Sequence, residues 1–140
     1  AHTAYREAEV AVNTLLGKKD YMRYTANPSV IYTQPEIASV GKTEEECKAK
    51  GIDYEVKKLP MAYAGRFVAE NEGETGLCKV IVDKRSKAIL GVHMIGNPCS
   101  EFVAAASFAV RMGYTVGEFK QVVFPHPTVA EVVREVIAEF

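Results

Sequence analysis

The sequence predicts an α+β domain, in which helices pack on an antiparallel β-sheet. Two observations support this fold class. Short runs rich in Val, Ile and Tyr follow one another across brief turns, and helical patterns flank these runs without regular strand-helix-strand alternation. A length of 140 residues with 48% apolar residues is enough for one domain with one continuous core.

Five segments are expected to be β-strands: residues 29–33, 37–41, 54–59, 77–83 and 88–95. The last two flank a polar turn at residues 84–87, so an antiparallel hairpin is predicted there. Pro60 is expected to end the third strand. Three glycines interrupt residues 61–76, for which a loop with at most one strand is predicted.

The first helix is predicted at residues 5–16, where apolar residues recur at helical spacing and Gly17 follows as a C-terminal glycine. Residues 18–28 are polar, end in Asn-Pro and are interpreted as a connector. A domain boundary is expected in this connector.

The other helices are predicted from their caps. A threonine followed by a glutamate three residues later, the capping-box pattern, occurs at residues 43–46, 115–118 and 128–131. Asn97 with Pro98 predicts the N-cap and first position of a well-buried helix that ends at Gly113. The last helix has one apolar face, formed by Val129, Val132, Val133, Val136 and Ile137.

The charges exclude two classes of partner. Because 17 basic and 18 acidic side chains are interspersed, neither nucleic acid nor a membrane surface is expected to bind. No apolar stretch approaches the roughly 20 residues that cross a bilayer. The chain begins at Ala1 without an initiator Met, so a piece of a longer protein is expected.

The cysteines are expected to be packed rather than reactive. Cys47, Cys78 and Cys99 lie at wide spacings that suit neither a disulfide framework nor a metal site. No metal is predicted, and a reducing, cytoplasmic setting is expected. His93, inside a predicted strand, is interpreted as a structural histidine with its hydrogen bonds satisfied.

His126 and Glu131 are the candidate catalytic pair. His126 lies between Pro125 and Pro127, whose rings restrict its backbone, and the His126-Pro127 bond could be cis. Histidine ordinarily titrates near neutral pH, so it can take a proton from a thiol and return it. Glu131 falls in the first helical turn, where a side chain points back toward His126 and can fix the imidazole tautomer.

The same residues have a purely structural interpretation. Thr128 and Glu131 also form a capping box, and His126 could be an ordinary loop residue. On spacing alone, this structural interpretation is the favoured one.

Two motifs far apart in the chain strengthen the catalytic interpretation. The segment IYTQPEIASVGKTEEE at residues 31–46 and the pattern His-Pro-Thr-x-x-Glu at residues 126–131 strongly resemble the dihydrolipoamide dehydrogenase branch of the pyridine-nucleotide-disulfide oxidoreductases. Residues 76–80 and 89–93 resemble a hairpin of the same family, so the resemblance covers nearly the whole chain.

The resemblance implies the C-terminal interface domain of a homodimeric flavoenzyme. Such an enzyme oxidises dihydrolipoyl groups and passes electrons through a redox disulfide and FAD to NAD. Its expected partners are lipoyl-bearing proteins of 2-oxo-acid dehydrogenase or glycine-cleavage complexes. The isolated chain is expected to bind neither cofactor and to be inactive.

The resemblance also assigns roles to residues. His126 would act, with Glu131 as its partner, on the flavin and disulfide of the opposite subunit, and Pro127 would lie beside the cofactor with it. Ala1 and His2 resemble the end of the FAD-binding domain, where the backbone approaches the flavin. Residues 1–28 would then be the tail of that domain, the linking helix and the connector, and residues 29–140 the interface domain.

Two alternatives remain open. One is a non-catalytic association module in which the apolar face of the last helix meets a partner. The other is the interface domain of a glutathione-reductase-like disulfide reductase, which shares the His-Pro-Thr and Glu pattern. Residues 123–125 are bulkier than is usual in the lipoamide branch, and Val129-Ala130 replaces the more usual Leu-Ser. These departures leave the substrate open.

Overall fold

A five-stranded antiparallel sheet forms the centre of the computed structural model, which describes all of residues 1–140. Its order is β1-β2-β5-β4-β3. The strands are β1 (Ser29–Ile31), β2 (Ile37–Gly41), β3 (Tyr54–Pro60), β4 (Leu77–Asp83) and β5 (Ile89–Ile95). All neighbouring pairs are antiparallel, which confirms the predicted fold class and the hairpin of β4 and β5.

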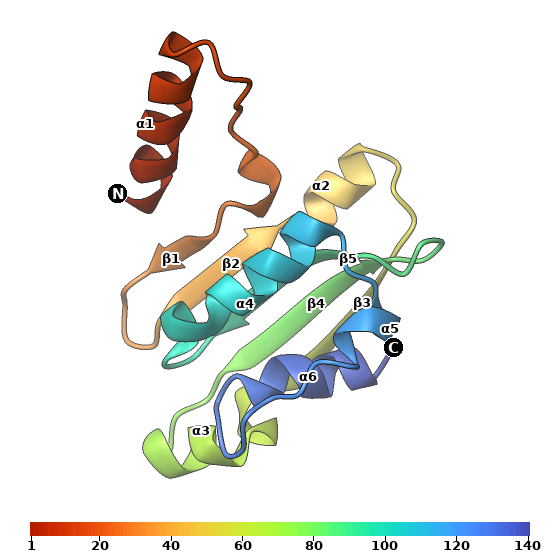
Figure 1. Cartoon of the computed structure of the whole chain (residues 1–140). Coiled ribbons are helices and arrows are strands. Elements are labelled where there is room, and N and C mark those ends of the chain that lie inside the picture. Colours follow the sequence, from red (N-terminus) through yellow and green to blue (C-terminus); the bar gives the residue numbers. More distant parts are fainter.

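Two helices cover one face of this sheet. The chain as a whole has the helices α1 (His2–Leu15), α2 (Glu44–Ala49), α3 (Gly65–Glu70), α4 (Cys99–Met112), α5 (Val116–Phe119) and α6 (Glu131–Ala138), with short 3₁₀ turns at Tyr24–Ala26 and Met61–Tyr63. α4 packs over β2 and β5, and α6 packs over β3 and β4 (Figure 1). None of the helices combines the length and the apolar character that crossing a bilayer requires.

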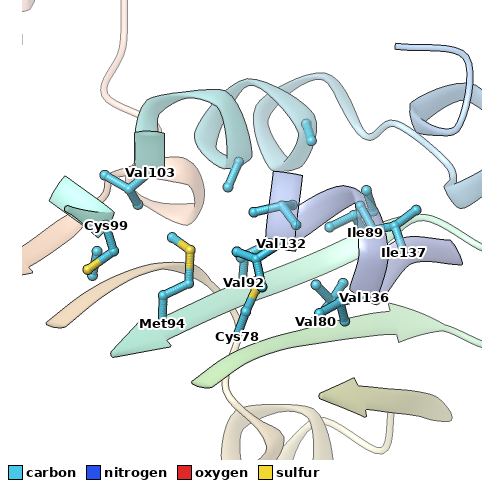
Figure 2. Packing of buried hydrophobic residues seen from close by; sticks show 14 of the residues in the cluster. Cys78, Val80, Ile89, Val92, Met94, Cys99, Val103, Val132, Val136 and Ile137 are labelled. Carbon is cyan, nitrogen blue, oxygen red and sulfur yellow. The ribbon is translucent and has the colours of Figure 1, made fainter. Parts of the chain in front are cut away.

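The core lies between the sheet and these two helices. Alternation along the strands points Val80, Val92 and Met94 toward the helices, and Val103 of α4 and Val136 of α6 meet them (Figure 2). The five apolar residues predicted to form one face from residue 129 to residue 137 are all buried, which confirms that prediction. The three cysteines are also buried and free, as predicted.

Two glycines allow β2 and β5 to approach closely where β2 ends. A Cβ on Gly41, whose φ is +82°, would lie 2.2 Å from the Leu90 carbonyl oxygen, and one on Gly91 would lie 2.2 Å from that of Lys42. The Lys42 N–H donates to the Leu90 carbonyl at 2.8 Å. His93 Nε2 lies 3.0 Å from the Lys42 carbonyl oxygen, which supports the structural role predicted for this histidine.

The prediction of a loop with at most one strand at residues 61–76 was wrong. This segment contains a 3₁₀ turn and α3 instead. Met61 and Phe67 are almost fully buried and anchor the two turns against the core. Gly65 is the first residue of α3 rather than a break in it, and a helix of six residues is too short to show a period in the sequence.

The predicted start of α4 also needs correction. Pro98, not Asn97, occupies the N-cap position, and no side chain caps this helix. The Asn97 side chain instead accepts from the Glu36 N–H at 2.9 Å and donates to Gln34 at 2.7 Å. Asn97 therefore joins the start of α4 to the turn between β1 and β2. The helix is not buried all round, because Phe108 is 69% exposed.

α1 was predicted correctly as a helix, but none of its residues is buried. It begins three residues before the predicted Tyr5, and Gly17 follows with a positive φ of 73°. α1 lies to one side of the sheet (Figure 1). The Arg6–Asp20 ion pair ties it to the connector.

Ile137→Ala is expected to lower the free energy of unfolding by about 2–5 kcal/mol, because the lost side chain leaves a cavity between α6 and the sheet. Ile137 is 1% exposed, whereas Leu15 on α1 is 85% exposed. Leu15→Ala, the matched control, is expected to change stability by at most about 0.5 kcal/mol. Urea unfolding followed by circular dichroism measures both. Equal destabilisation by the two substitutions would contradict the described core.

Candidate functional site

The loop between α5 and α6 carries the candidate site and is anchored at both ends. Phe124 packs on Phe119, with ring centroids 5.8 Å apart, and Val129 is 5% exposed. Between these anchors the His126 side chain is 81% exposed. The His126-Pro127 peptide is cis. The fold thus holds the loop firmly while the imidazole faces outward.

Glu131 meets His126 as the sequence predicted. Glu131 is the first residue of α6 and is only 7% exposed, because the apolar face of α6 lies on the sheet. His126 Nδ1 lies 3.0 Å from Glu131 Oε1 and 3.2 Å from Oε2. The Thr128 N–H donates to Oε2 at 2.9 Å. One carboxylate therefore holds both the ring and the backbone of the loop.

The capping box predicted at residues 128–131 is only half formed. The Glu131 carboxylate does reach back to the Thr128 N–H, but the Thr128 hydroxyl donates to the Pro125 carbonyl at 2.8 Å. The N-cap position of α6 is Ala130, which offers no side-chain cap. By contrast, the boxes predicted at residues 43–46 and 115–118 are complete. The Glu131 half of the box is formed, so the same carboxylate bonds the Thr128 N–H and contacts His126.

The charge of Glu131 determines where the imidazole proton lies. The hydrogen bond from the Thr128 N–H, supported by His126 and opposed by burial, lowers the pKa of the Glu131 carboxyl. An ionised carboxylate can only accept hydrogen bonds, so His126 Nδ1 carries the hydrogen that it donates. When the ring is neutral, Nε2 therefore keeps its lone pair and can accept a proton from a group outside the chain.

Nothing else in the chain provides a redox or metal centre. Burial raises the pKa of the Cys78 thiol to about 12 and that of Cys99 to about 11, so neither forms a thiolate readily at neutral pH. No group of His, Cys, Asp and Glu side chains is arranged to hold a metal ion. The chemistry that the geometry offers is proton transfer at His126 Nε2.

Ala1 and His2 do not join His126 and Pro127 in one site. The N-terminus lies near β1, well apart from the loop between α5 and α6 (Figure 1). His2 Nε2 lies 2.8 Å from the Pro28 carbonyl oxygen, at the end of the connector. One chain therefore presents two separate regions, and the four residues predicted to approach a cofactor do not line a single site.

The sequence reasoning missed one part of this site. The Thr128 N–H and His126 Nδ1 are the two atoms that hold the Glu131 carboxylate, and the capping-box pattern at residues 128–131 predicts the first of these contacts. Phe124 anchors the loop by packing on Phe119, whereas the sequence marked it only as bulkier than usual. Two aromatic residues five positions apart gave a weak signal for this contact.

Comparison with known proteins gives the family. Residues 27–137 match the family model of the pyridine nucleotide-disulphide oxidoreductase dimerisation domain. The chain therefore belongs to this family of dimerisation domains.

Two relatives are similar over almost the whole chain. A mitochondrial dihydrolipoyl dehydrogenase from Caenorhabditis elegans is 38% identical over 96% of this chain, and a leghemoglobin reductase from Glycine max is also 38% identical over 96%. The chain spans only 27% and 26% of these two relatives, respectively.

A solved structure shares the fold. The HOCl-induced flavoprotein disulfide reductase RclA from Escherichia coli superposes with a TM-score of 0.82 at 23% identity, covering 93% of this chain and 30% of that protein.

Glu131 is expected to make stability depend on pH. Its carboxyl has a pKa below the ordinary value of 4.5 in the folded chain. The ionised carboxylate therefore contributes its full share to the free energy of unfolding at pH values above the pKa that Glu131 has in the unfolded chain. This contribution is lost as pH falls through the lower pKa that Glu131 has in the folded chain. Between about pH 6 and pH 3, the wild type should lose more free energy of unfolding than Glu131→Gln, which cannot ionise.

Urea titrations at these two pH values measure the difference. Glu72→Gln, in an exposed turn, is the matched control and should follow the wild type. If Glu131→Gln followed the wild type as closely as this control, the hydrogen bond from Thr128 would not favour the ionised carboxylate.

Proposed function

We propose that this chain is the interface domain of a homodimeric dihydrolipoyl dehydrogenase, which oxidises dihydrolipoyl groups and uses FAD and NAD. The observation that carries the proposal is the contact of 3.0 Å between His126 Nδ1 and a buried carboxylate, with the ring otherwise exposed. The identity of 38% to a dihydrolipoyl dehydrogenase supports the substrate. The proposed partners are lipoyl-bearing proteins of 2-oxo-acid dehydrogenase or glycine-cleavage complexes.

In this proposal His126 is the base. Its Nε2 takes the proton of a dihydrolipoyl thiol, and the electron pair of the S–H bond stays on sulfur. Glu131 holds the ring through Nδ1 and stabilises the imidazolium that forms. The thiolate then attacks one sulfur of a redox disulfide of the opposite subunit, so that a mixed disulfide forms while the old S–S bond breaks and its other cysteine leaves as a thiolate. Because the three cysteines of this chain are buried and free, the proposal places that disulfide elsewhere in the protein.

In this proposal FAD and NAD carry the electrons, whereas His126 carries the proton. Bound FAD would supply the electron acceptor next to the disulfide, and NAD would take the electrons onward. His126 and Pro127 are proposed to approach the flavin of the opposite subunit, and Ala1 and His2 that of their own. The separation of these two regions within one chain supports a site shared between subunits.

The domain boundary is proposed to lie at residue 28. Residues 1–28 then form the tail of the FAD-binding domain, the linking helix and the connector, and residues 29–140 form the interface domain. The absence of buried residues in α1 supports this division, as does the start of the family match at residue 27. We also propose a reducing compartment, the cytoplasm, because the three cysteines are free.

In the full-length enzyme, His126→Gln is expected to reduce the rate of dihydrolipoamide-dependent NAD reduction by about 10²–10⁴-fold, because the base is lost. The flavin content should stay unchanged. His93→Gln is the matched control: this histidine lies on the opposite side of the sheet from α6 and should leave the rate within about two-fold. Steady-state rates and flavin absorbance measure both. An unchanged rate in His126→Gln would refute the role of this histidine.

The substrate is tested on the wild-type enzyme with two compounds. Dihydrolipoamide should be oxidised, and glutathione disulfide should not be reduced at a comparable rate. Turnover of glutathione disulfide without turnover of dihydrolipoamide would assign the chain to the glutathione-reductase-like alternative instead. The 140-residue chain alone is expected to catalyse neither reaction.

A further inference from the structure

A pocket between the connector and α4 gathers three guanidinium groups from three separate elements. Its volume is about 380 Å³, which is in the range of small-molecule sites. Arg6 comes from α1, Arg23 from the connector and Arg111 from the last turn of α4. The 3₁₀ turn at Tyr24–Ala26 packs on α4 and brings the two walls together. No aspartate or glutamate lines the pocket, so its wall is cationic.

Two of these three guanidiniums have no carboxylate partner. Arg6 is paired with Asp20 and with Glu9, so its charge is already matched. Arg23 and Arg111 form no ion pair within the chain. The positive charge of the pocket therefore comes from Arg23 and Arg111, and both groups are available to an external anion.

Two exposed aromatic rings line the same pocket. Tyr21 is 60% exposed and Phe108 is 69% exposed. The Arg23 guanidinium lies over the Tyr21 ring, with Cζ 4.9 Å from the centroid, and it donates a hydrogen bond to the Tyr21 hydroxyl. This hydrogen bond, together with the positive charges of Arg23 and Arg111, lowers the pKa of the hydroxyl. Aromatic surface and unmatched positive charge thus lie next to each other.

These features favour an aromatic phosphate monoester over other anions. A phosphate monoester carries about two negative charges at pH 7, so one such group can neutralise both Arg23 and Arg111, whereas a carboxylate carries a single charge. The guanidinium fork also matches the geometry of phosphate oxygens. An aromatic ring attached to the phosphate can pack on Phe108 and cover apolar surface that is otherwise exposed.

A second pocket, beside β2 and α2, also contains two basic residues. Its volume is about 330 Å³, and it is lined by Lys42 and Lys50, but Glu46 lines it as well and offsets part of their charge. Its one aromatic ring belongs to Tyr24, whose hydroxyl already donates to Glu7 at 2.7 Å. This pocket therefore lacks the combination of unmatched guanidiniums and free aromatic surface.

We propose that the pocket between the connector and α4 binds a small aromatic phosphate monoester, with the phosphate on Arg23 and Arg111 and the ring against Phe108. None of the lining residues belongs to the loop that carries His126, so the inference goes beyond the proposed function. Because the pocket joins α1 and the connector to α4, the bound ligand would bridge the two sides of the boundary proposed at residue 28.

Isothermal titration calorimetry of the 140-residue chain tests the ligand class with three probes. 1-Naphthyl phosphate is expected to bind with a Kd below about 1 mM. 1-Naphthoate keeps the ring but carries one charge, and inorganic phosphate keeps the charge but has no ring. Each should bind at least about ten-fold more weakly. Equal affinity for 1-naphthoate would overturn the assignment of a phosphate, and equal affinity for inorganic phosphate would overturn the role of the ring.

Substitutions test the location of the site. Arg111→Gln and Arg23→Gln should each weaken the binding of 1-naphthyl phosphate at least about ten-fold, because each removes one of the two unmatched charges. Phe108→Ala should weaken it at least about three-fold. Arg85→Gln, in the exposed turn between β4 and β5, is the matched control and should stay within about two-fold of wild type. Circular dichroism confirms that each variant is folded.

Three results would overturn the inference. They are a wild-type chain that does not bind 1-naphthyl phosphate, unchanged binding in Arg111→Gln, and a loss of binding in Lys50→Gln that Arg111→Gln does not share. The last result would place the ligand in the second pocket. These measurements involve neither flavin nor dihydrolipoamide, so their outcome is separate from that of His126→Gln in the full-length enzyme.

Discussion

The carboxylate of Glu131 is the group on which the candidate site depends. It accepts the Thr128 N–H at 2.9 Å and faces His126 Nδ1 at 3.0 Å, so one side chain fixes both the loop and the ring. Without it, the imidazole would have no hydrogen-bond partner within the chain, and either nitrogen could carry the proton. A buried carboxylate that stays ionised therefore converts an exposed histidine into an oriented base.

The packing of α6 and of the preceding loop fixes the position of this carboxylate. The valines of α6 and Ile137 are buried against β3 and β4, which fixes the start of the helix relative to the loop. Phe124 and Val129 fix the loop on either side of His126. His126 Nε2, the nitrogen proposed to take the proton, takes no part in these packing contacts, and the His126 side chain is exposed. A domain built in this way offers a base at its surface to a substrate held by another part of the protein.

Much of this structure could be predicted from the sequence, for identifiable physical reasons. The strands and the terminal helix follow from alternation and from apolar spacing, which are local properties. The contact between His126 and Glu131 was also predictable, because a helix directs its first side chains backward. Short α3 carries too little periodicity to be recognised, and Asn97 was misassigned because its partners Gln34 and Glu36 lie far away in the sequence. By contrast, the bond from the Thr128 N–H to Glu131 was predictable, because the capping-box pattern pairs these two groups.

The most direct measurement is the tautomer of His126, read from the ¹⁵N chemical shifts of its ring in the 140-residue chain. The spectrum is recorded well above the ordinary pKa of histidine, with His126→Gln used to separate its signals from those of His2 and His93. The expected result is a hydrogen on Nδ1 in the wild type and the loss of this preference in Glu131→Gln. A wild-type ring that carries its hydrogen on Nε2 would leave no free base there, and it would contradict the role assigned to Glu131.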